Sequence, residues 1–182
     1  MRYASIRETD ISDGPGVRVA LYTQGCIHKC KGCFNEETWD PEGGKEFTEK
    51  EFDTVIALLQ KNYIKGLSIL GGDPFYQYDI GEVEQEDFLY RLIKQTHELG
   101  KDVWIWTGYT WETLIDKHSG DLFNNVIRVL PYIDVIVDGP YIDSLRNLNL
   151  PYAGSENQRV IDVQKSLEKS EVVLYDKQEY NK

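Results

Sequence analysis

Long apolar runs and positive charge are what this sequence has least of. No run of apolar residues approaches the roughly 18 that a membrane-spanning helix needs, and residues 1–8 lack the apolar core of a signal peptide. Lys and Arg number 20 against 31 Asp and Glu, a formal net charge of −11, which argues against non-specific binding to nucleic acid or to an anionic membrane. We therefore expect a cytoplasmic protein that binds neither of them.

Cysteine is also scarce, and its few residues are close together. The chain has three cysteines, Cys26, Cys30 and Cys33, all within eight consecutive positions. An odd number cannot be fully paired within the chain, and a disulfide framework spreads its cysteines more widely. The arrangement therefore indicates a reducing compartment and a metal or redox site.

The length of 182 residues favours one domain. A closed eight-unit β/α barrel usually needs about 250 residues, so at most a shortened barrel fits. Residues 1–163 are predicted to form the domain, and residues 164–182 are predicted to form a mostly polar C-terminal tail.

The hydrophobic pattern predicts alternating strands and helices, which implies right-handed crossovers and a mainly parallel sheet. A glycine-containing turn follows each of four predicted strands, and in a parallel sheet these ends gather on one face, where α/β proteins bind ligands. The predicted strands are 17–22, 67–70, 103–106 and 133–137, with a further one at 160–163; the predicted helices begin at Thr48, at Phe88 and at Trp111, and the turns contain Gly25, Gly71, Gly72, Gly108 and Gly139.

The cysteines follow the first predicted strand as a C-x3-C-x2-C loop. Three thiolates suit a 4Fe-4S cluster with one iron left open, because a closed cluster takes four cysteines. An open metal position is typical of catalytic sites. His28, Lys29 and Lys31 add local positive charge, which favours thiolates.

Two other interpretations of this loop stay open. The first is a zinc site with His28 as the fourth ligand, although His28 lies in a cramped position between Cys26 and Cys30 and zinc pairs are usually spaced C-x2-C or H-x3-H. The second is a redox-active thiol site, or cysteines that have no role.

Several further motifs carry a family resemblance. In their order along residues 1–163 they resemble the radical S-adenosylmethionine (SAM) superfamily and, within it, the family of activating proteins for anaerobic ribonucleotide reductase. Gly32 and Asp73 depart from the wider superfamily, where an aromatic residue and a glutamate are common, but both are typical of the activating family. The matching segments are 13–18, 25–35, 38–39, 71–74, 106–109, 137–139 and 154–159.

The resemblance implies an incomplete parallel β/α barrel of about six units, whose open side admits a glycine loop of a partner protein. Cys26, Cys30 and Cys33 would hold the cluster, and its open iron would bind SAM. One electron from a donor such as a flavodoxin would cleave SAM to methionine and a 5′-deoxyadenosyl radical. That radical would take a hydrogen atom from a glycine of the large subunit of the reductase and leave a glycyl radical there.

The resemblance and the strand ends together give a set of expected SAM contacts. For Asp73, Thr107 and Gly108 a simple turn role is the alternative, and for Phe34 a core position. The roles of Asn157, Gln158 and Arg159 stay open, and the four tryptophans are assigned to the core. Alternative functions are activation of another glycyl radical enzyme, of the formate acetyltransferase type, and a zinc-binding module without catalysis. The expected contacts are Gly32, Cys33, Phe34, Gly71, Gly72, Asp73, Thr107 and Gly108.

Overall fold

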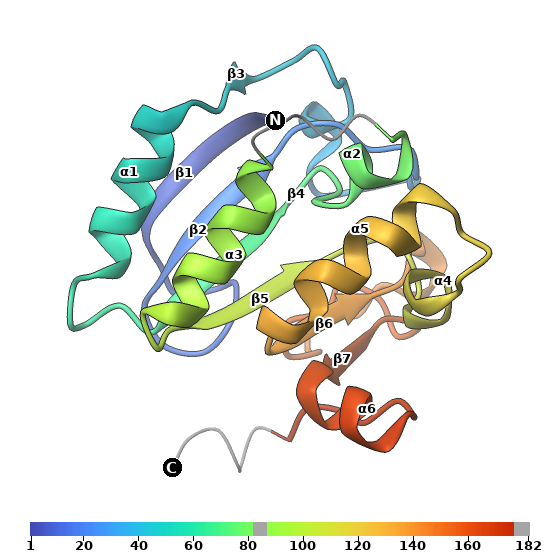
Figure 1. Cartoon of the computed structure of the whole chain (residues 1–182). Helices are drawn as coiled ribbons and strands as arrows, with labels where there is room; N and C mark the ends of the chain where they lie inside the picture. The colour runs from blue at the N-terminus through green and yellow to red at the C-terminus, as the bar shows by residue number, and fades with distance from the viewer. Residues whose placement is uncertain (82–86, 177–182) are drawn as a thin grey trace.

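The computed structural model describes residues 1–81 and 87–176, and it is built around one seven-stranded sheet (Figure 1). The strands lie in the order β3-β1-β2-β4-β5-β6-β7. Their bounds are β1 Arg2–Asp10, β2 Arg18–Thr23, β3 Lys45–Glu46, β4 Gly66–Gly71, β5 Asp102–Trp106, β6 Val135–Asp138 and β7 Arg159–Asp162. The helices are α1 Glu49–Leu59, α2 Tyr76–Asp79, α3 Phe88–Glu98, α4 Trp111–Ile115, α5 Asp121–Val129 and α6 Val163–Lys169.

The sheet is parallel at its centre and antiparallel at both sides. Strands β2, β4, β5 and β6 pair in parallel, whereas β1 pairs with β2, β3 with β1, and β7 with β6 in antiparallel fashion. The mixed α/β class is therefore confirmed, but the parallel part has four strands instead of about six units. The reason at the β7 side is that residues 139–158 return at the same end of the sheet, with one short 3-10 turn, Asp143–Leu145, in place of a crossover helix.

The helices begin where the sequence signals place them. The capping box of Thr48 and Glu51 starts α1, and the Thr110 hydroxyl accepts a hydrogen bond from the Thr113 N–H at the start of α4. Helix α5 and the long strand β1 have no counterpart among the predicted elements. None of the helices in the described part of the chain has the length and apolar character needed to cross a membrane.

The expected polar tail is folded as far as the structure describes it. Asp162 caps α6 by accepting a hydrogen bond from the Lys165 N–H, so the chain stays helical beyond the boundary expected at residue 163. Further on, Leu174 forms a bridge with Ile161, and the Tyr175 ring lies 4.9 Å from that of Trp104. Residues 177–182 of the expected tail lie outside the described residues.

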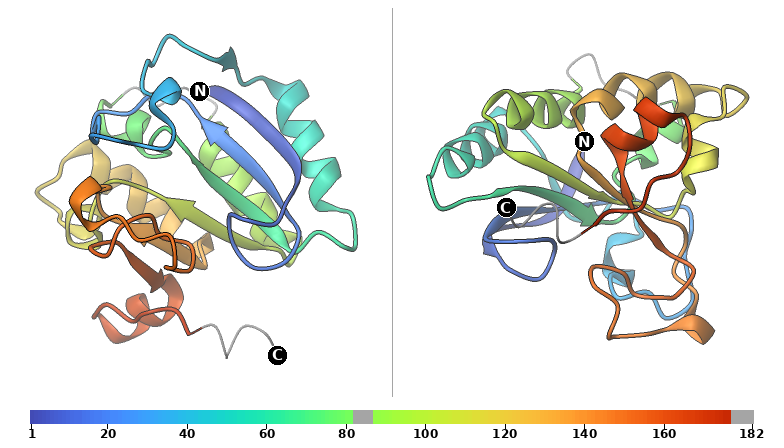
Figure 2. Two further views of the ribbon diagram at one scale, coloured as in Figure 1. Left: turned by 180° about the vertical axis from the view of Figure 1, so that it is seen from behind. Right: turned by 90° about the horizontal axis from the view of Figure 1, so that it is seen from below.

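The two faces of the sheet have different covers and different compositions. Helices α1, α3 and α5 pack on one face, here called the helical face (Figures 1 and 2). The opposite face, here called the cavity face, carries the cluster Ala20, Tyr22 and Leu70 with Trp106, and the segments 25–40 and 139–158 extend on this side (Figure 2). Fully buried aliphatic residues of the strands form the helical face: Val19, Leu21, Leu67, Ile69, Val103, Ile105 and Ile136.

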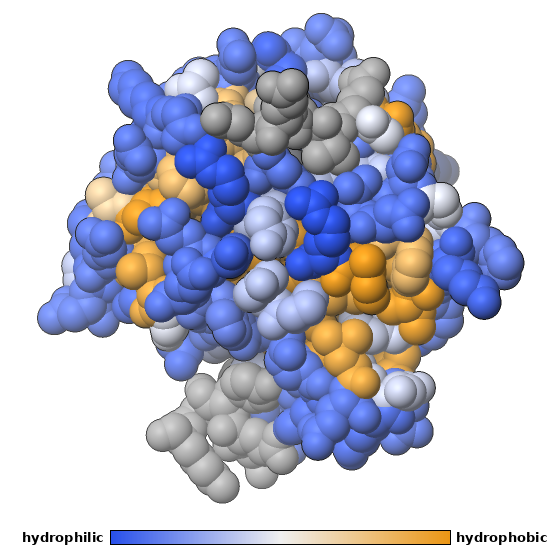
Figure 3. Space-filling model, viewed as in Figure 1, coloured by the Kyte–Doolittle hydropathy of each residue, from blue (hydrophilic) through white to orange (hydrophobic). Residues whose placement is uncertain are grey.

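Seen from the helical side, the surface of the molecule is mostly hydrophilic (Figure 3). Apolar residues show in separate patches near α1 and α5, and the exposed Ile115 and Ile127 lie on α4 and α5. Scattered apolar residues of this kind are ordinary on protein surfaces. The cavity face is therefore the place to look for a site.

Candidate functional site

A cavity of about 460 Å³ lies on the cavity face, at the carboxyl ends of β2, β4 and β5. Its volume falls in the range of small-molecule sites, about 300–1,000 Å³. Of the expected site residues, Gly32 alone is not among those that line the cavity; a Cβ at that position would lie 3.0 Å from Oδ1 of Asp143. The others line it together: Cys26, Cys30, Cys33, Phe34, Gly71, Gly72, Asp73, Thr107 and Gly108.

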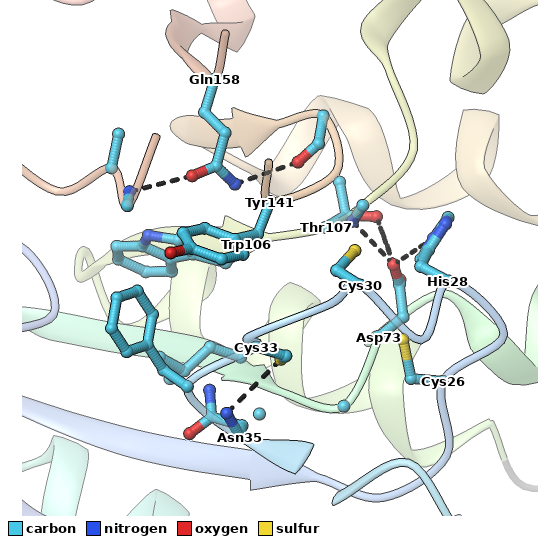
Figure 4. Close-up of a pocket in the computed structure, with 18 of the residues that line it drawn as sticks. Cys26, His28, Cys30, Cys33, Asn35, Asp73, Trp106, Thr107, Tyr141 and Gln158 are labelled. Carbon is cyan, nitrogen blue, oxygen red and sulfur yellow. Dashed lines mark hydrogen bonds and ion pairs between the residues drawn. The ribbon is translucent and has the colours of Figure 1, made fainter. Parts of the chain in front are cut away.

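The cysteine loop is closed at its base by backbone hydrogen bonds. The Gly25 N–H donates to the Thr38 carbonyl at 2.8 Å and the Cys26 N–H to the Trp39 carbonyl at 3.2 Å. These bonds bring the two ends of the loop together directly after β2. Figure 4 shows the loop running around the cavity with Cys26, Cys30 and Cys33 along it. All three are free thiols and half-buried.

The electrostatic environment of the thiols differs from the expectation. Burial raises the pKa of Cys26 to about 11, and the negative charge of Asp73 adds to this shift. Burial also raises the pKa of Cys30. Lys29 and Lys31 are exposed to solvent, where their charges are screened. For Cys26 and Cys30 in the protein without a bound metal, burial therefore outweighs the neighbouring positive charges that were expected to favour thiolates.

His28 is turned toward Asp73. Its Nε2 lies 2.9 Å from Oδ2 of Asp73, and its ring meets the Tyr109 ring edge-on at 4.5 Å between centroids. Among the residues described by the structure, no three His, Cys, Asp or Glu side chains are close enough together to hold a metal ion. This holds for the three cysteines as well, so a bound metal group would have to draw them together; the observation that speaks against His28 as a zinc ligand is that its Nε2 is engaged with Asp73. As a donor set, the three cysteines fit an iron–sulfur cluster, because they are free, share one loop and line one cavity.

Asp73 connects three loops of the site. Its carboxylate accepts hydrogen bonds from the Thr107 hydroxyl at 2.9 and 3.0 Å, from the Gly108 N–H at 2.8 Å and from the Phe75 N–H at 2.9 Å. The residue is only 2% exposed. These bonds fix the end of β4 to the end of β5, and Figure 4 shows His28 and Thr107 on either side of the carboxylate.

Gly71 and Gly72 allow the chain to pass close to the base of the cysteine loop. Gly71 has a φ of +102°, and a Cβ on Gly72 would lie 2.5 Å from the Gly25 carbonyl oxygen. The Asp73 N–H donates to this same carbonyl at 2.8 Å. A side chain at Gly72 would therefore push the two loops apart, whereas one at Gly71 would meet the backbone of Tyr22 and Thr23 in β2 and would need a strained φ.

Several cavity residues were missed by the sequence reasoning. Trp106, assigned to the core, lines the cavity and donates from Nε1 to the Tyr152 carbonyl at 2.7 Å. Tyr22 and Leu70 occupy matching places on β2 and β4. The period of two along each strand was the available signal, because alternate residues share a face. Tyr141, Leu148 and Gln158 come from the irregular segment 139–158, which gave no such signal.

The structure also gives roles to the residues left open by the sequence. The Gln158 side chain accepts from the Gly154 and Ser155 N–H groups at 2.9 and 3.2 Å and donates to the Gly139 carbonyl at 3.0 Å. Asn157 donates to the Pro140 carbonyl at 2.7 Å. These amides hold segment 139–158 over the cavity face.

Arg159 binds below this segment. Its guanidinium contacts Asp138 at 2.5 Å and Glu112 at 2.8 Å. The hydrogen bonds that the guanidinium donates to these two carboxylates raise the pKa of Arg159. Arg159 therefore ties β7 to β6 and α4, and it is a structural residue.

Comparison with known proteins finds one matching family and several relatives that share a name. Residues 12–161 match the family described as 4Fe-4S single cluster domain. The chain is 39% identical over 160 residues to the anaerobic ribonucleoside-triphosphate reductase-activating protein of Vibrio cholerae, covering 87% of this chain and 96% of that protein. The protein of the same name from Enterobacteria phage T4 is 38% identical, covering 88% and 93% of the two chains, and that from Escherichia coli strain K12 is 34% identical, covering 88% and 97%.

Proposed function

The chain belongs to the family of anaerobic ribonucleoside-triphosphate reductase-activating proteins, and from this we propose that it installs a glycyl radical on an anaerobic ribonucleotide reductase. The reductase is proposed as the target because the relatives are named as its activating proteins. The site carries the chemistry, since one loop supplies three thiols to a cavity that two glycine-rich strand ends also line.

The cofactor in this proposal is a 4Fe-4S cluster held by Cys26, Cys30 and Cys33. When bound, it supplies one open iron for SAM and one electron for its cleavage. Burial raises the pKa of Cys26 and Cys30, so loading of the cluster would release protons from these two thiols. Loading would also draw the three sulfur atoms together. The base of the loop, fixed at Thr38 and Trp39, limits this movement to the loop itself.

The chain's own residues bind and orient SAM. Gly71 and Gly72 bring backbone groups to the cavity wall without side chains in the way. Phe34, Tyr22 and Trp106 supply apolar surface that excludes water from the reacting atoms. Cys33, Thr107 and Gly108 complete the wall beside the expected SAM position.

The proposed reaction uses one electron and one molecule of SAM for each glycyl radical. One electron from a reduced flavodoxin-type donor enters SAM, and its C5′–S bond breaks to give methionine and a 5′-deoxyadenosyl radical. This radical takes a hydrogen atom from the Cα of a glycine in the large subunit of the reductase, which yields 5′-deoxyadenosine and the glycyl radical. In this proposal the sheet is the wall of an incomplete barrel, and the glycine loop enters at its open side.

Formation of 5′-deoxyadenosine tests the chemistry. We expect protein reconstituted anaerobically with iron and sulfide to hold about four irons per chain and to form 5′-deoxyadenosine when dithionite and SAM are added. Cys26→Ala, Cys30→Ala and Cys33→Ala should each abolish formation. A colourless protein that retains one equivalent of zinc, or unchanged turnover in any of the three variants, would contradict the proposal.

A further inference from the structure

We infer that Asp73 is the junction of the site's loops and that His28, by binding Asp73, is a positioning residue that sets the cysteine loop for SAM binding. The part of this inference that concerns SAM binding rests on the proposed function. It removes Asp73 from the expected SAM contacts and gives His28 a task other than metal binding.

The Asp73 carboxylate is saturated with hydrogen bonds. A carboxylate has about four lone-pair sites. Oδ1 accepts from the Phe75 N–H and the Thr107 hydroxyl, and Oδ2 lies within 3.0 Å of the Thr107 hydroxyl, the Gly108 N–H and His28 Nε2. A buried carboxylate with this many donors has no lone pair left for the amino group of SAM, which must find its acceptors elsewhere in the cavity.

The His28 ring fills a space that exists because residue 108 is a glycine. A Cβ on Gly108 would collide with the His28 ring, so a glycine at this strand end is what lets the ring approach. The Tyr109 ring also contacts the His28 ring, edge-on and at 4.5 Å between centroids. The His28 side chain is only 17% exposed although it belongs to a surface loop.

The position of His28 in the chain lets it join two distant segments. It lies between Cys26 and Cys30, and 45 residues separate it from Asp73. Its contact with Asp73 is a side-chain hydrogen bond that joins the cysteine loop to the loop after β4 and, through Asp73, to the loop after β5. This tether holds the cysteine loop in place beside the loops at the ends of β4 and β5. Because the loops are already ordered, less conformational entropy is lost when SAM binds between them.

The test compares His28→Leu, which keeps bulk but has no donor, with His28→Gln, whose amide N–H replaces the donor. His118→Leu is the matched control, because His118 is exposed and does not line the cavity. The first readout is amide hydrogen exchange of residues 26–35 in protein without a cluster. We expect about 10-fold faster exchange in His28→Leu, a rate near wild type in His28→Gln, and no change in His118→Leu.

The second readout is SAM affinity, measured by titrating SAM into the reduced cluster and following its electron paramagnetic resonance (EPR) spectrum. We expect His28→Leu to load as much iron as wild type, since the cysteines are intact, and to bind SAM about 10-fold more weakly. Turnover at saturating SAM should fall much less than kcat/KM. His28→Gln should recover most of the affinity.

Asp73→Asn separates a junction from a direct SAM contact. Both carboxylate oxygens accept from backbone N–H groups, of Phe75 and Gly108, so the NH₂ of asparagine faces one of them in either orientation. A junction predicts faster exchange in the protein without a cluster. Exchange at wild-type rates in both His28→Leu and Asp73→Asn would overturn the inference, and so would unchanged SAM affinity in His28→Leu. Failure of wild-type protein to bind a cluster or SAM would instead refute the proposed function, and the exchange experiment would still decide the tether.

Discussion

The two faces of the central sheet are made by the same strands, but one face forms the apolar core and the other lines the cavity. On the helical face, side chains such as Leu67 and Ile105 are fully buried and aliphatic. On the cavity face, the alternate residues include Tyr22 and Trp106, which line a cavity. Burying one aliphatic side chain contributes roughly 1.5–3 kcal/mol, so the helical face dominates stability. The cavity face is left free to hold polar loops and ligands.

The loops on the cavity face are held by a different kind of interaction. Asp73, Asn157 and Gln158 each join separate segments through hydrogen bonds to backbone groups. Such bonds contribute about 1 kcal/mol each, but they fix directions that apolar packing does not. Substitutions on the helical face should therefore cost mainly stability, whereas substitutions on the cavity face should cost activity together with a smaller loss of stability.

The largest effect is expected from the cysteine loop. Cys30→Ala should reduce 5′-deoxyadenosine formation to background, because two thiols do not hold the cluster. The side chain is only half-buried, so thermal unfolding of the protein without a cluster should change little. A large loss of thermal stability in that form would break the division between the two faces.

The next effect belongs to the helical face. Leu67→Ala deletes a side chain with 0% exposure and should lower the free energy of unfolding by about 2–5 kcal/mol. Urea denaturation measures this loss. Below the unfolding transition, 5′-deoxyadenosine formation per folded molecule should equal that of wild type, and a matching loss of turnover would contradict the separation.

A smaller effect is expected at Gln158. Gln158→Leu leaves the N–H groups of Gly154 and Ser155 and the carbonyl of Gly139 without their partner. The free energy of unfolding should fall by about 1–3 kcal/mol. Gln158→Glu keeps the acceptor and should lose less. If segment 139–158 shapes the cavity, the KM for SAM rises in Gln158→Leu; an unchanged KM would show that the segment is a cover without influence on the site.

The smallest effect is a pH dependence at Asp10, which ends β1. Burial alone raises the pKa of this carboxyl, but hydrogen bonds from the backbone N–H groups of Asp13 and Ser12 and from Arg7 outweigh it and hold the pKa below the ordinary 3.8. Its contribution to stability is therefore present above 3.8 and is lost as pH falls through the lower value of the folded protein. Urea midpoints of wild type and Asp10→Asn are measured from about pH 7 to about pH 2.5. The difference between the two midpoints should shrink as the pH falls, and a difference that stays constant would contradict this.

Much of the fold was predictable because its signals are local. The capping box at Thr48 and the glycine turns that follow β2, β4 and β5 were visible in the sequence. The antiparallel β7 was not, because its direction depends on segment 139–158, whose path is set by long-range hydrogen bonds of Gln158. The folded part of the expected tail depends on contacts with Trp104 and Ile161, far away in the chain.

The candidate site divides in the same way. The cysteine loop and Gly71–Gly72 were readable, because spacing and glycine content are properties of short segments. The pairing of His28 with Asp73 was not, since it joins residues 45 positions apart. The place of Trp106 in the cavity was hidden by the assignment of the tryptophans to the core.

The most direct test of the account is an EPR measurement on the partner. The reconstituted protein is mixed anaerobically with the large subunit of an anaerobic ribonucleotide reductase, a reduced flavodoxin-type donor and SAM. The account predicts a glycyl radical signal on the reductase that requires SAM and is absent with Cys30→Ala. A loaded protein that forms 5′-deoxyadenosine but yields no radical on the reductase, or a signal that persists with Cys30→Ala, would contradict it.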